Sequence, residues 1–371
     1  MSLVIRCWHI KQWLKDVATN TTRSDRLTDS GSRALRWLRN SAQLTSLGFN
    51  VLSALKQPMG VVNALDAVGP LHWAHGVQKA LLSPFAVSNW KFAFKNSKEL
   101  GPLVRSYDRD LAAISRSYAD SVGNRAMQAT YLAAFTPLSA MQAIANVATW
   151  HGAYQQATAQ GMSEQEAYDA ADKVVRTTQG SGALKDLTGM QRGGEASKLF
   201  TMFYSYFSIV YNRMADIQVR EKGAKNLHRK AMRYTILLLI PSLLNMLADD
   251  AWDDMFHEDR AEKNDATPFL TRLALETVSS AVAAFPVARE FYSGAEAIFT
   301  GNRPRSLPAI GVLEQLTRAG SAAKDIAYDG DPLTRAKARS IVQATGILIN
   351  QPIYGIYRAI DDVFGAKIFD E

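Results

Sequence analysis

Hydrophobic residues recur at helical spacing through almost every long segment of this chain, and strand-like alternation of apolar and polar residues is rare. Apolar side chains three and four residues apart fall on one face of an α-helix, whereas a half-buried strand requires a period of two. The pattern therefore predicts an all-α protein, an extended multi-helix bundle of about a dozen helices.

Residues that begin and end helices agree with this prediction. Ser163–Glu166 has the form of a capping box, in which a serine hydroxyl and a glutamate carboxylate each accept a hydrogen bond from an unpaired backbone N–H. Thr267–Pro268 and Asp331–Pro332 each place an N-cap residue before a proline, which is tolerated at the first helical position. The glycines predicted to end helices are Gly161, Gly223 and Gly330.

Charge divides the 371-residue chain, whose formal net charge is +7, into three predicted regions. Residues 1–40 carry eight Lys/Arg and three Asp and are predicted to form a basic arm, either mobile or surface-bound. Residues 41–250 are predicted to form a helical core module and residues 251–371 a C-terminal helical region. Residues 177–194 contain five glycines and predict a long irregular connection. Cys7 is the only cysteine, so no internal disulfide is possible.

Three segments are more apolar than one core-facing stripe requires. Residues 126–150 carry no charge and are long enough to span a bilayer, but Pro137 and many polar residues weaken their transfer into lipid. Residues 199–212 are apolar on most sides of a predicted helix, which favours a central core helix or an interface. Residues 234–248 are uncharged, but at about 22 Å they are shorter than the roughly 30 Å hydrocarbon core, and Pro241 is predicted to kink them.

The flanks of the third segment carry opposite charge. Residues 213–233 contain seven Lys/Arg and two acids, and residues 249–265 contain eight acids and two bases. That asymmetry is typical of an oriented membrane segment. Residues 277–288 form another short apolar run and predict an apolar hairpin with residues 234–248. Insertion of this hairpin into a membrane and its burial in a soluble oligomer both remain open. The predicted membrane or oligomer contacts are Phe200, Phe203, Tyr206, Phe207, Tyr211, Leu237, Leu238, Leu239, Leu243 and Leu244.

Residues that could perform chemistry do not gather into a recognisable centre. His72 and His75 could share a helix face, but no further metal ligand lies at suitable spacing. Asp249, Asp250, Asp253 and Asp254 are predicted to form a solvated acidic helix end. No phosphate-binding glycine loop or nucleophile elbow is present. We therefore predict a non-enzymatic protein with no catalytic residues, metal, cofactor or small-molecule substrate.

Basic residues form two groups that could contact phosphate. Arginine and lysine side chains neutralise DNA phosphates without reading sequence, and they also attract anionic lipids. A solvated helix face is the competing interpretation for both groups. The predicted DNA or anionic-lipid contacts are Arg33, Arg36, Arg39, Arg220, Lys222, Lys225, Arg229, Lys230 and Arg233.

Two strings give the chain a resemblance to a known family. Phe49–Gly69 contains FNVLSALKQP, and residues 169–214 combine a helix ending in Val-Arg-Thr-Thr-Gln, a Gly/Ser loop, a Gln-Arg-Gly turn and a Phe/Tyr-rich helix. Over residues 44–250 the chain resembles the large polyvalent-protein-associated modules of tailed bacteriophages, which occur in long virion proteins that travel with the genome. Residues 1–40 and the last hundred or so lie outside the resemblance.

The resemblance implies an internal virion or ejection protein, a helical homo-oligomer that helps form a conduit for genome delivery across the host envelope. Its implied partners are copies of itself and other virion proteins, with non-specific DNA and the bacterial membrane as further candidates. Its implied location is the virion interior, then the host envelope on ejection. Two alternatives stay open: a soluble scaffold or packing module of the virion, and an integral, pore-forming membrane protein.

Overall fold

A computed structural model describes residues 3–19, 21–22, 29–106, 125–180, 184–201, 204–221, 223, 226–256, 268–285, 308–349, 352–353, 355–357 and 360. Within these residues the chain contains 16 α-helices and no strand, which confirms the predicted all-α class. The 16 α-helices also agree with the dozen or so that the periodicity predicts.

The described helices follow one another along the chain in two groups. Those of the first half are α1 (Leu3–Thr19), α2 (Ser30–Leu47), α3 (Val51–Lys56), the 3-10 helix η2 (Gln57–Val61), α4 (Val62–Val68), α5 (Pro70–Val77), the π-helix η3 (Gln78–Leu82), α6 (Ala86–Asn96), α7 (Leu100–Ser106), α9 (Arg125–Ala159) and α10 (Glu164–Thr178). Those of the second half are α11 (Glu195–Phe200), α12 (Tyr204–Arg220), α13 (Leu227–Tyr234), the π-helix η5 (Thr235–Leu239), α14 (Ile240–Phe256), α16 (Phe269–Ala283), α18 (Pro308–Tyr328) and α19 (Arg335–Leu348).

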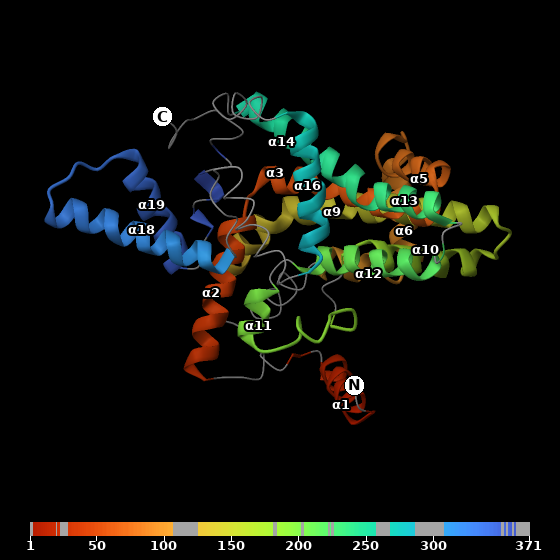
Figure 1. Ribbon diagram of the computed structural model, residues 1–371, viewed down its shortest axis with the longest axis horizontal. Helices are drawn as coiled ribbons and strands as arrows, with labels where there is room; N and C mark the ends of the chain where they lie inside the picture. Colours follow the sequence, from red (N-terminus) through yellow and green to blue (C-terminus); the bar gives the residue numbers. More distant parts are fainter. Residues whose placement is uncertain are drawn as a thin grey trace.

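Helix α9 is the long central element of the fold. It runs along the long axis of the molecule, with α5, α6 and α10 at one end and α2, α18 and α19 toward the other (Figure 1). Its C-terminal half supplies the main core, where Trp150 is fully buried among apolar side chains from α4, α6, α7 and α10. Residues 126–150 therefore contribute to a packed protein core rather than to a free apolar helix.

A buried carboxylate ties four elements of this core together. Asp172 on α10 accepts a hydrogen bond from Trp150 Nε1 on α9 at 2.9 Å. It also accepts from Ser97 Oγ at 2.5 Å and from the Lys98 backbone N–H at 2.8 Å, which join α6 to α7. Because a buried charge is stable only when it is fully hydrogen-bonded, these contacts determine how α6, α9 and α10 meet.

Within the predicted basic arm, the structure describes helix α1 and the first part of α2. Helix α2 runs through the proposed boundary at residue 40 and packs against α11, α18 and α19. Buried Glu195 on α11 accepts from Arg36 Nε at 3.1 Å and from Arg39 Nε at 3.0 Å. In α1, buried Asp16 pairs with Arg192 at 3.1 Å. Arg36 and Arg39, which were predicted to contact DNA or anionic lipid, therefore pair with an acidic residue far away in the sequence.

Most of the predicted helix boundaries are confirmed. Ser163 and Glu166 form the capping box at the start of α10. Gly161, Gly223 and Gly330 follow helix ends with φ values of 78°, 96° and 70°, a left-handed conformation that glycine adopts without steric penalty.

Three predictions of local structure are wrong. Helix α16 begins one residue after Pro268, and Thr267 lies outside the described residues. Helix α19 begins at Arg335 with Thr334 as its N-cap, so Pro332 lies in the preceding connection. Residues 199–212 are divided between α11, which ends at Phe200, and α12, which begins at Tyr204. Of the predicted irregular connection over residues 177–194, residues 177 and 178 are the end of α10, and the described residues from 179 onward are irregular up to α11.

Candidate functional site

The apolar stretch over residues 234–248 is the middle of a longer helix. Helices α13, η5 and α14 follow one another without a gap, so that Leu227–Met255 is a single 29-residue helix long and apolar enough to cross a membrane. At 1.5 Å per residue it is about 44 Å long, which exceeds the roughly 30 Å hydrocarbon core. Counting only the uncharged residues 234–248 therefore underestimates the length of the helix, because the helix continues into both charged flanks.

A π-turn accommodates Pro241 within this helix. The Ile240 N–H donates to the Thr235 carbonyl, five residues back, instead of four as in an α-helix. Proline lacks an N–H, and its ring clashes with the carbonyl four residues before it in a regular α-helix. The wider turn immediately before Pro241 absorbs this mismatch, so the helix continues through the residue that was predicted to kink it.

The described part of the chain covers this helix only in part. Of residues 234–248, four are buried, nine are half-buried, and Thr235 and Leu247 are exposed. Fully buried residues make up 22% of the 18-residue apolar window of the helix. Leu247 is 47% exposed, and Leu227, Met232 and Met255 are more exposed still. The neighbouring helix α16 is similar, with Leu270 76% exposed. Extended apolar surface of this kind marks contact with another protein or with lipid.

Helices α14 and α16 form the predicted apolar pair. They pack against each other, and Ser242 Oγ lies 3.1 Å from Ser280 Oγ between them. Ion pairs hold the acidic end of α14: Asp250 pairs with Arg272 on α16, and Asp249 pairs with Lys56 on α3. The acidic end is therefore attached to its neighbours, and it is not only a solvated helix terminus.

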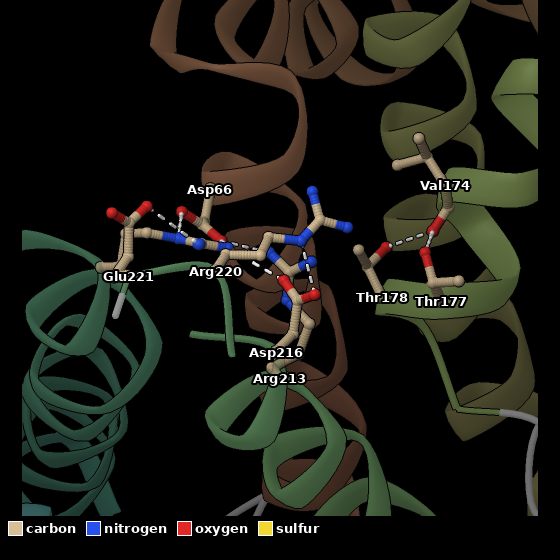
Figure 2. A network of polar contacts seen from close by, with 9 residues as sticks. Asp66, Val174, Thr177, Thr178, Arg213, Asp216, Arg220 and Glu221 are labelled. Carbon is tan, nitrogen blue, oxygen red and sulfur yellow. Dashed lines mark hydrogen bonds and ion pairs between the residues drawn. The ribbon is translucent and has the colours of Figure 1, made fainter. Parts of the chain in front are cut away.

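At the basic end, a network of charged side chains joins this helix to the body (Figure 2). Asp66 on α4 accepts from Arg233 Nε and Nη2 at 2.8 and 2.9 Å, and from Arg213 Nη2 at 2.5 Å. Arg233 also donates to Asp216 at 3.2 Å and to Glu221 at 3.4 Å. Asp66 is thus the carboxylate shared by α12 and α13, and it links both helices to α4.

The electrostatics of this network follow from its partial burial. Burial lowers the pKa of Arg213, while the adjacent Asp66 acts in the opposite direction. Burial also acts to raise the pKa of Asp216, but hydrogen bonds from Arg220 and Arg233 outweigh it and hold that pKa below its ordinary value. The network therefore consists of paired charges, which are stable in a partly dry environment only while every partner is present.

The predicted apolar contact residues occupy different environments. Leu237 is buried in a cluster with Val210 and Ile217, and Leu238 packs against that cluster. Leu239, Leu243 and Leu244 are half-buried. Tyr211 is exposed and meets Phe285 edge-on, with ring centroids 5.5 Å apart, and Phe207 is half-buried beside Tyr204. Phe203, and the side chains of Phe200 and Tyr206, lie outside what the structure describes.

The predicted phosphate contacts divide into inward and outward side chains. Arg39 is buried on Glu195 and Arg233 points into the Asp66 network, so neither faces solvent, and Arg36 also pairs with Glu195. Lys230 donates to Gln218. Arg33 and Arg229 are exposed, and Arg220 is 70% exposed although it pairs with Asp216. Lys222 and Lys225 lie outside the described residues.

Sequence reasoning missed two features of this region. Asp66, far from the basic run in sequence, carries no local signal for its role, because its partners come from α12 and α13. The exposed apolar residues of α16 begin at Phe269, before the predicted run over residues 277–288. The start of that helix could have been found from the apolar spacing of Phe269, Leu270 and Leu273.

The described residues contain no cluster of three His, Cys, Asp or Glu side chains that could hold a metal ion. Comparisons with protein families, with curated proteins and with solved structures find no match to this chain. The arrangement itself defines a class of surface: an apolar helical pair that the described residues cover only in part, with bases at one end and acids at the other.

Proposed function

We propose that this chain is a non-catalytic helical virion protein that oligomerises and uses the helix Leu227–Met255, with α16, to help form a membrane conduit for a phage genome. The observation that carries the membrane part is a 29-residue helix whose 18-residue apolar window has only 22% of its residues buried. The virion part rests on the resemblance of residues 44–250 to phage modules. DNA passing through such a conduit would be a non-specific partner.

Charge gives this helix a preferred orientation in a bilayer. The exposed Arg229 lies near its N-terminal end, and the acidic residues Asp253 and Asp254 lie near its C-terminal end. Basic groups near an anionic leaflet each add about 1 kcal/mol of attraction. The basic end is therefore expected to stay on the side of the bilayer that carries anionic lipid.

A soluble packing module of the virion is the second candidate. Ion pairs from Asp249 and Asp250 hold the acidic end of α14 against α3 and α16, which favours a helix that stays on the protein body. In that case the exposed apolar face would meet another subunit. The integral pore-forming alternative shares the membrane surface of the leading proposal and differs in requiring detergent for extraction.

Flotation of the full chain with liposomes tests the membrane part. We expect binding that increases with anionic lipid, and protease protection of a fragment containing residues 227–255. Leu247→Asp should weaken flotation about tenfold, because a charge in hydrocarbon costs about 1–3 kcal/mol depending on depth. The matched control is Leu333→Asp, which places the same charge on an exposed leucine in a connection outside the helical pair.

Two results would decide against membrane action. One is a stable oligomer in plain buffer that never floats with either lipid composition, which would favour the packing module. The other is an equal loss of flotation in Leu247→Asp and Leu333→Asp, which would mean that the helix is not the membrane contact.

A further inference from the structure

The turn between η3 and α6 presents a run of apolar side chains to solvent. Leu81, Leu82, Phe85 and Val87 fall within the seven residues 81–87, and their exposed fractions are 48%, 75%, 70% and 71%. A single exposed leucine is common on protein surfaces, but several large apolar side chains in one turn make a continuous patch. A patch of this kind marks contact with another molecule.

Side chains of α6 hold the turn against η3. Trp90 Nε1 donates to the Ala80 carbonyl at 2.9 Å, and Asn89 Nδ2 donates to the Lys79 carbonyl at 3.0 Å. The last carbonyls of a helix have no partner within that helix, so these two bonds satisfy acceptors that would otherwise need water. The apolar patch therefore stands on a fixed support that joins two helical elements.

Backbone donors at the tip of the turn are paired inside the protein. The Ser83 N–H donates to the Gln78 carbonyl at 2.9 Å, and Pro84 has no N–H. The Phe85 N–H donates to Ser83 Oγ at 3.1 Å, and the Ala86 N–H donates to the Ser83 carbonyl at 2.9 Å. An unpaired N–H is costly to remove from water. The tip can therefore enter an apolar phase without leaving these donors unpaired.

Basic side chains lie just behind the patch. Lys91 and Lys95 are exposed on α6, four and eight residues after Val87, so the three side chains share one face of the helix. At 1.5 Å per residue, Lys91 is about 6 Å from Val87 along the helix axis. Neither η3 and α6 nor the described helices that pack most closely against them, α5, α7 and α9, contain Asp or Glu. Positive charge beside the patch is therefore not neutralised by these helices.

The combination of an apolar tip and basic charge behind it fits the surface of an anionic membrane. Apolar side chains of interfacial proteins enter the boundary between headgroups and acyl chains to a depth of about 5–10 Å. With the tip at that depth, Lys91 lies at the level of the lipid phosphates, which its long side chain can reach. A protein partner can supply hydrogen-bond acceptors of its own, whereas a bilayer requires the paired donors that this turn has.

We propose that the η3–α6 turn docks on an anionic lipid bilayer, with Leu82, Phe85 and Val87 in the interface and with Lys91 and Lys95 at the phosphates. The presence of a membrane partner rests on the function proposed above, whereas the chemistry of the turn does not. The contact is peripheral, because it holds the protein body against the bilayer without spanning it. It is separate from insertion of the helix Leu227–Met255.

A dye placed at the tip of the full chain tests this contact directly. Cys7 is the only cysteine, so Phe85→Cys in a Cys7→Ser background carries one environment-sensitive dye at the tip. Tyr328→Cys in the same background is the control, because Tyr328 is 84% exposed on α18. The vesicles contain phosphatidylcholine alone or mixed with phosphatidylglycerol. We expect the mixed vesicles to shift the emission of the dye at position 85 to the blue, and a nitroxide on the acyl chain to quench it, with neither effect at position 328.

Substitutions separate the apolar part of the contact from its charge. Phe85→Ser should weaken binding to the mixed vesicles about tenfold, whereas Tyr328→Ser should leave it unchanged. Lys91→Gln should weaken binding to the mixed vesicles about fivefold and have no effect with phosphatidylcholine alone. Its matched control is Lys324→Gln, which removes the same charge from the exposed surface of α18.

Three results would overturn the proposal. One is an unchanged dye at position 85 in a chain that binds the mixed vesicles. Another is an equal loss of binding in Phe85→Ser and Tyr328→Ser, or in Lys91→Gln and Lys324→Gln, which would indicate diffuse attraction. The third is a dye shift at position 85 that increases with protein concentration in the absence of vesicles, which would assign the patch to a second copy of the chain.

The outcomes also separate this contact from the proposed conduit. A response of the dye at position 85, in a chain that shows no protease protection of residues 227–255, would establish the docking turn and remove the conduit. Protection of residues 227–255 without any response at position 85 would leave the conduit and remove the docking turn.

Discussion

Residues 126–163 and residues 234–248 both lack Asp, Glu, Lys and Arg, and both are largely helical. The first stretch is the more polar, yet its residues 142–153 are all buried except one. Gln142 donates to Asn146 and Gln179, and Gln179 donates to Thr149, so much of the buried polar surface is hydrogen-bonded. The second stretch is aliphatic, yet most of its residues are only half-buried.

The difference shows that hydropathy does not by itself determine burial. Helices α4–α7 and α10 surround one side of α9 and satisfy its polar groups. Among the described elements, α3, α4, α12 and α16 contact parts of α13–η5–α14, and Leu247 on its surface stays 47% exposed. The following predictions test how far the packed region and the open helical pair differ.

Truncating one side chain in each region is expected to give the largest difference in the free energy of unfolding. Trp150→Ala should lower the free energy of unfolding by about 3–5 kcal/mol, because it removes a fully buried side chain and leaves a cavity. Leu247→Ala, on the exposed face of α14, should change it by less than about 0.5 kcal/mol. Chemical denaturation in buffer measures both. Similar losses for the two variants would mean that the helical pair is covered in solution, by another copy of the chain.

Removing the charge of Asp66, which links α4 to α12 and α13, is expected to have the next largest effect on stability. Asp66→Asn should destabilise the fold by about 3 kcal/mol, because Arg213 and Arg233 would keep their charges in a partly buried site without a carboxylate. Arg220→Gln, at the exposed edge of the same network, should cost less than about 1 kcal/mol.

Asp66→Asn also tests, in the presence of lipid, whether residues 227–255 separate from the body before the α9 region unfolds. If the network holds α13 on the protein body, the variant should expose residues 227–255 to hydrogen exchange before the α9 region, and it should float with anionic liposomes more readily. Uniform loss of protection across both regions would show that they unfold as one unit.

The close contact of α5 with α9 is expected to give an intermediate effect. Gly76→Ala should destabilise the packed region by about 1–3 kcal/mol, because its Cβ would overlap the Ala148 carbonyl. Gly320→Ala, in the interior of α18, meets no atom within 4 Å and should stabilise the chain by about 0.5–1 kcal/mol. Thermal unfolding distinguishes the signs. Stabilisation by both substitutions would contradict the observed helix spacing.

A change of pH is expected to have the smallest effect on the free energy of unfolding. Burial lowers the pKa of His75 and His151 from an ordinary value of 6.5, so the unfolded chain binds more protons than the folded chain just below that pH. The free energy of unfolding should therefore decrease as pH falls below 6.5. Above that pH, the two histidines make their full contribution to stability. His151→Gln should flatten this slope, whereas His228→Gln, on the exposed surface of α13, should preserve it. An unchanged slope in His151→Gln would show that burial of this imidazole does not control the pH response.

Local features of the fold were predictable from the sequence because their causes are local. Apolar spacing predicts the helices, the capping box at Ser163 predicts the start of α10, and glycines that adopt positive φ predict helix ends at Gly161, Gly223 and Gly330. The apolar pair was also predictable, since α14 and α16 each carry an uncharged run and lie close in sequence. Charge asymmetry around residues 234–248 indicated the candidate membrane surface for the same reason.

Tertiary structure decided which of these features are buried and which are exposed. Arg39 and Arg233 carry the same basic signal as Arg33 and Arg229, but carboxylates from distant segments, Glu195 and Asp66, meet only the first two. The close contact of α5 with α9 likewise depends on Gly76 and Gly152, which come from distant parts of the chain. By itself the sequence determined the helices, their caps and their charges, because those depend on neighbours within a few residues. Which faces meet depends on contacts across the whole fold, and burial and ion pairing follow from those contacts.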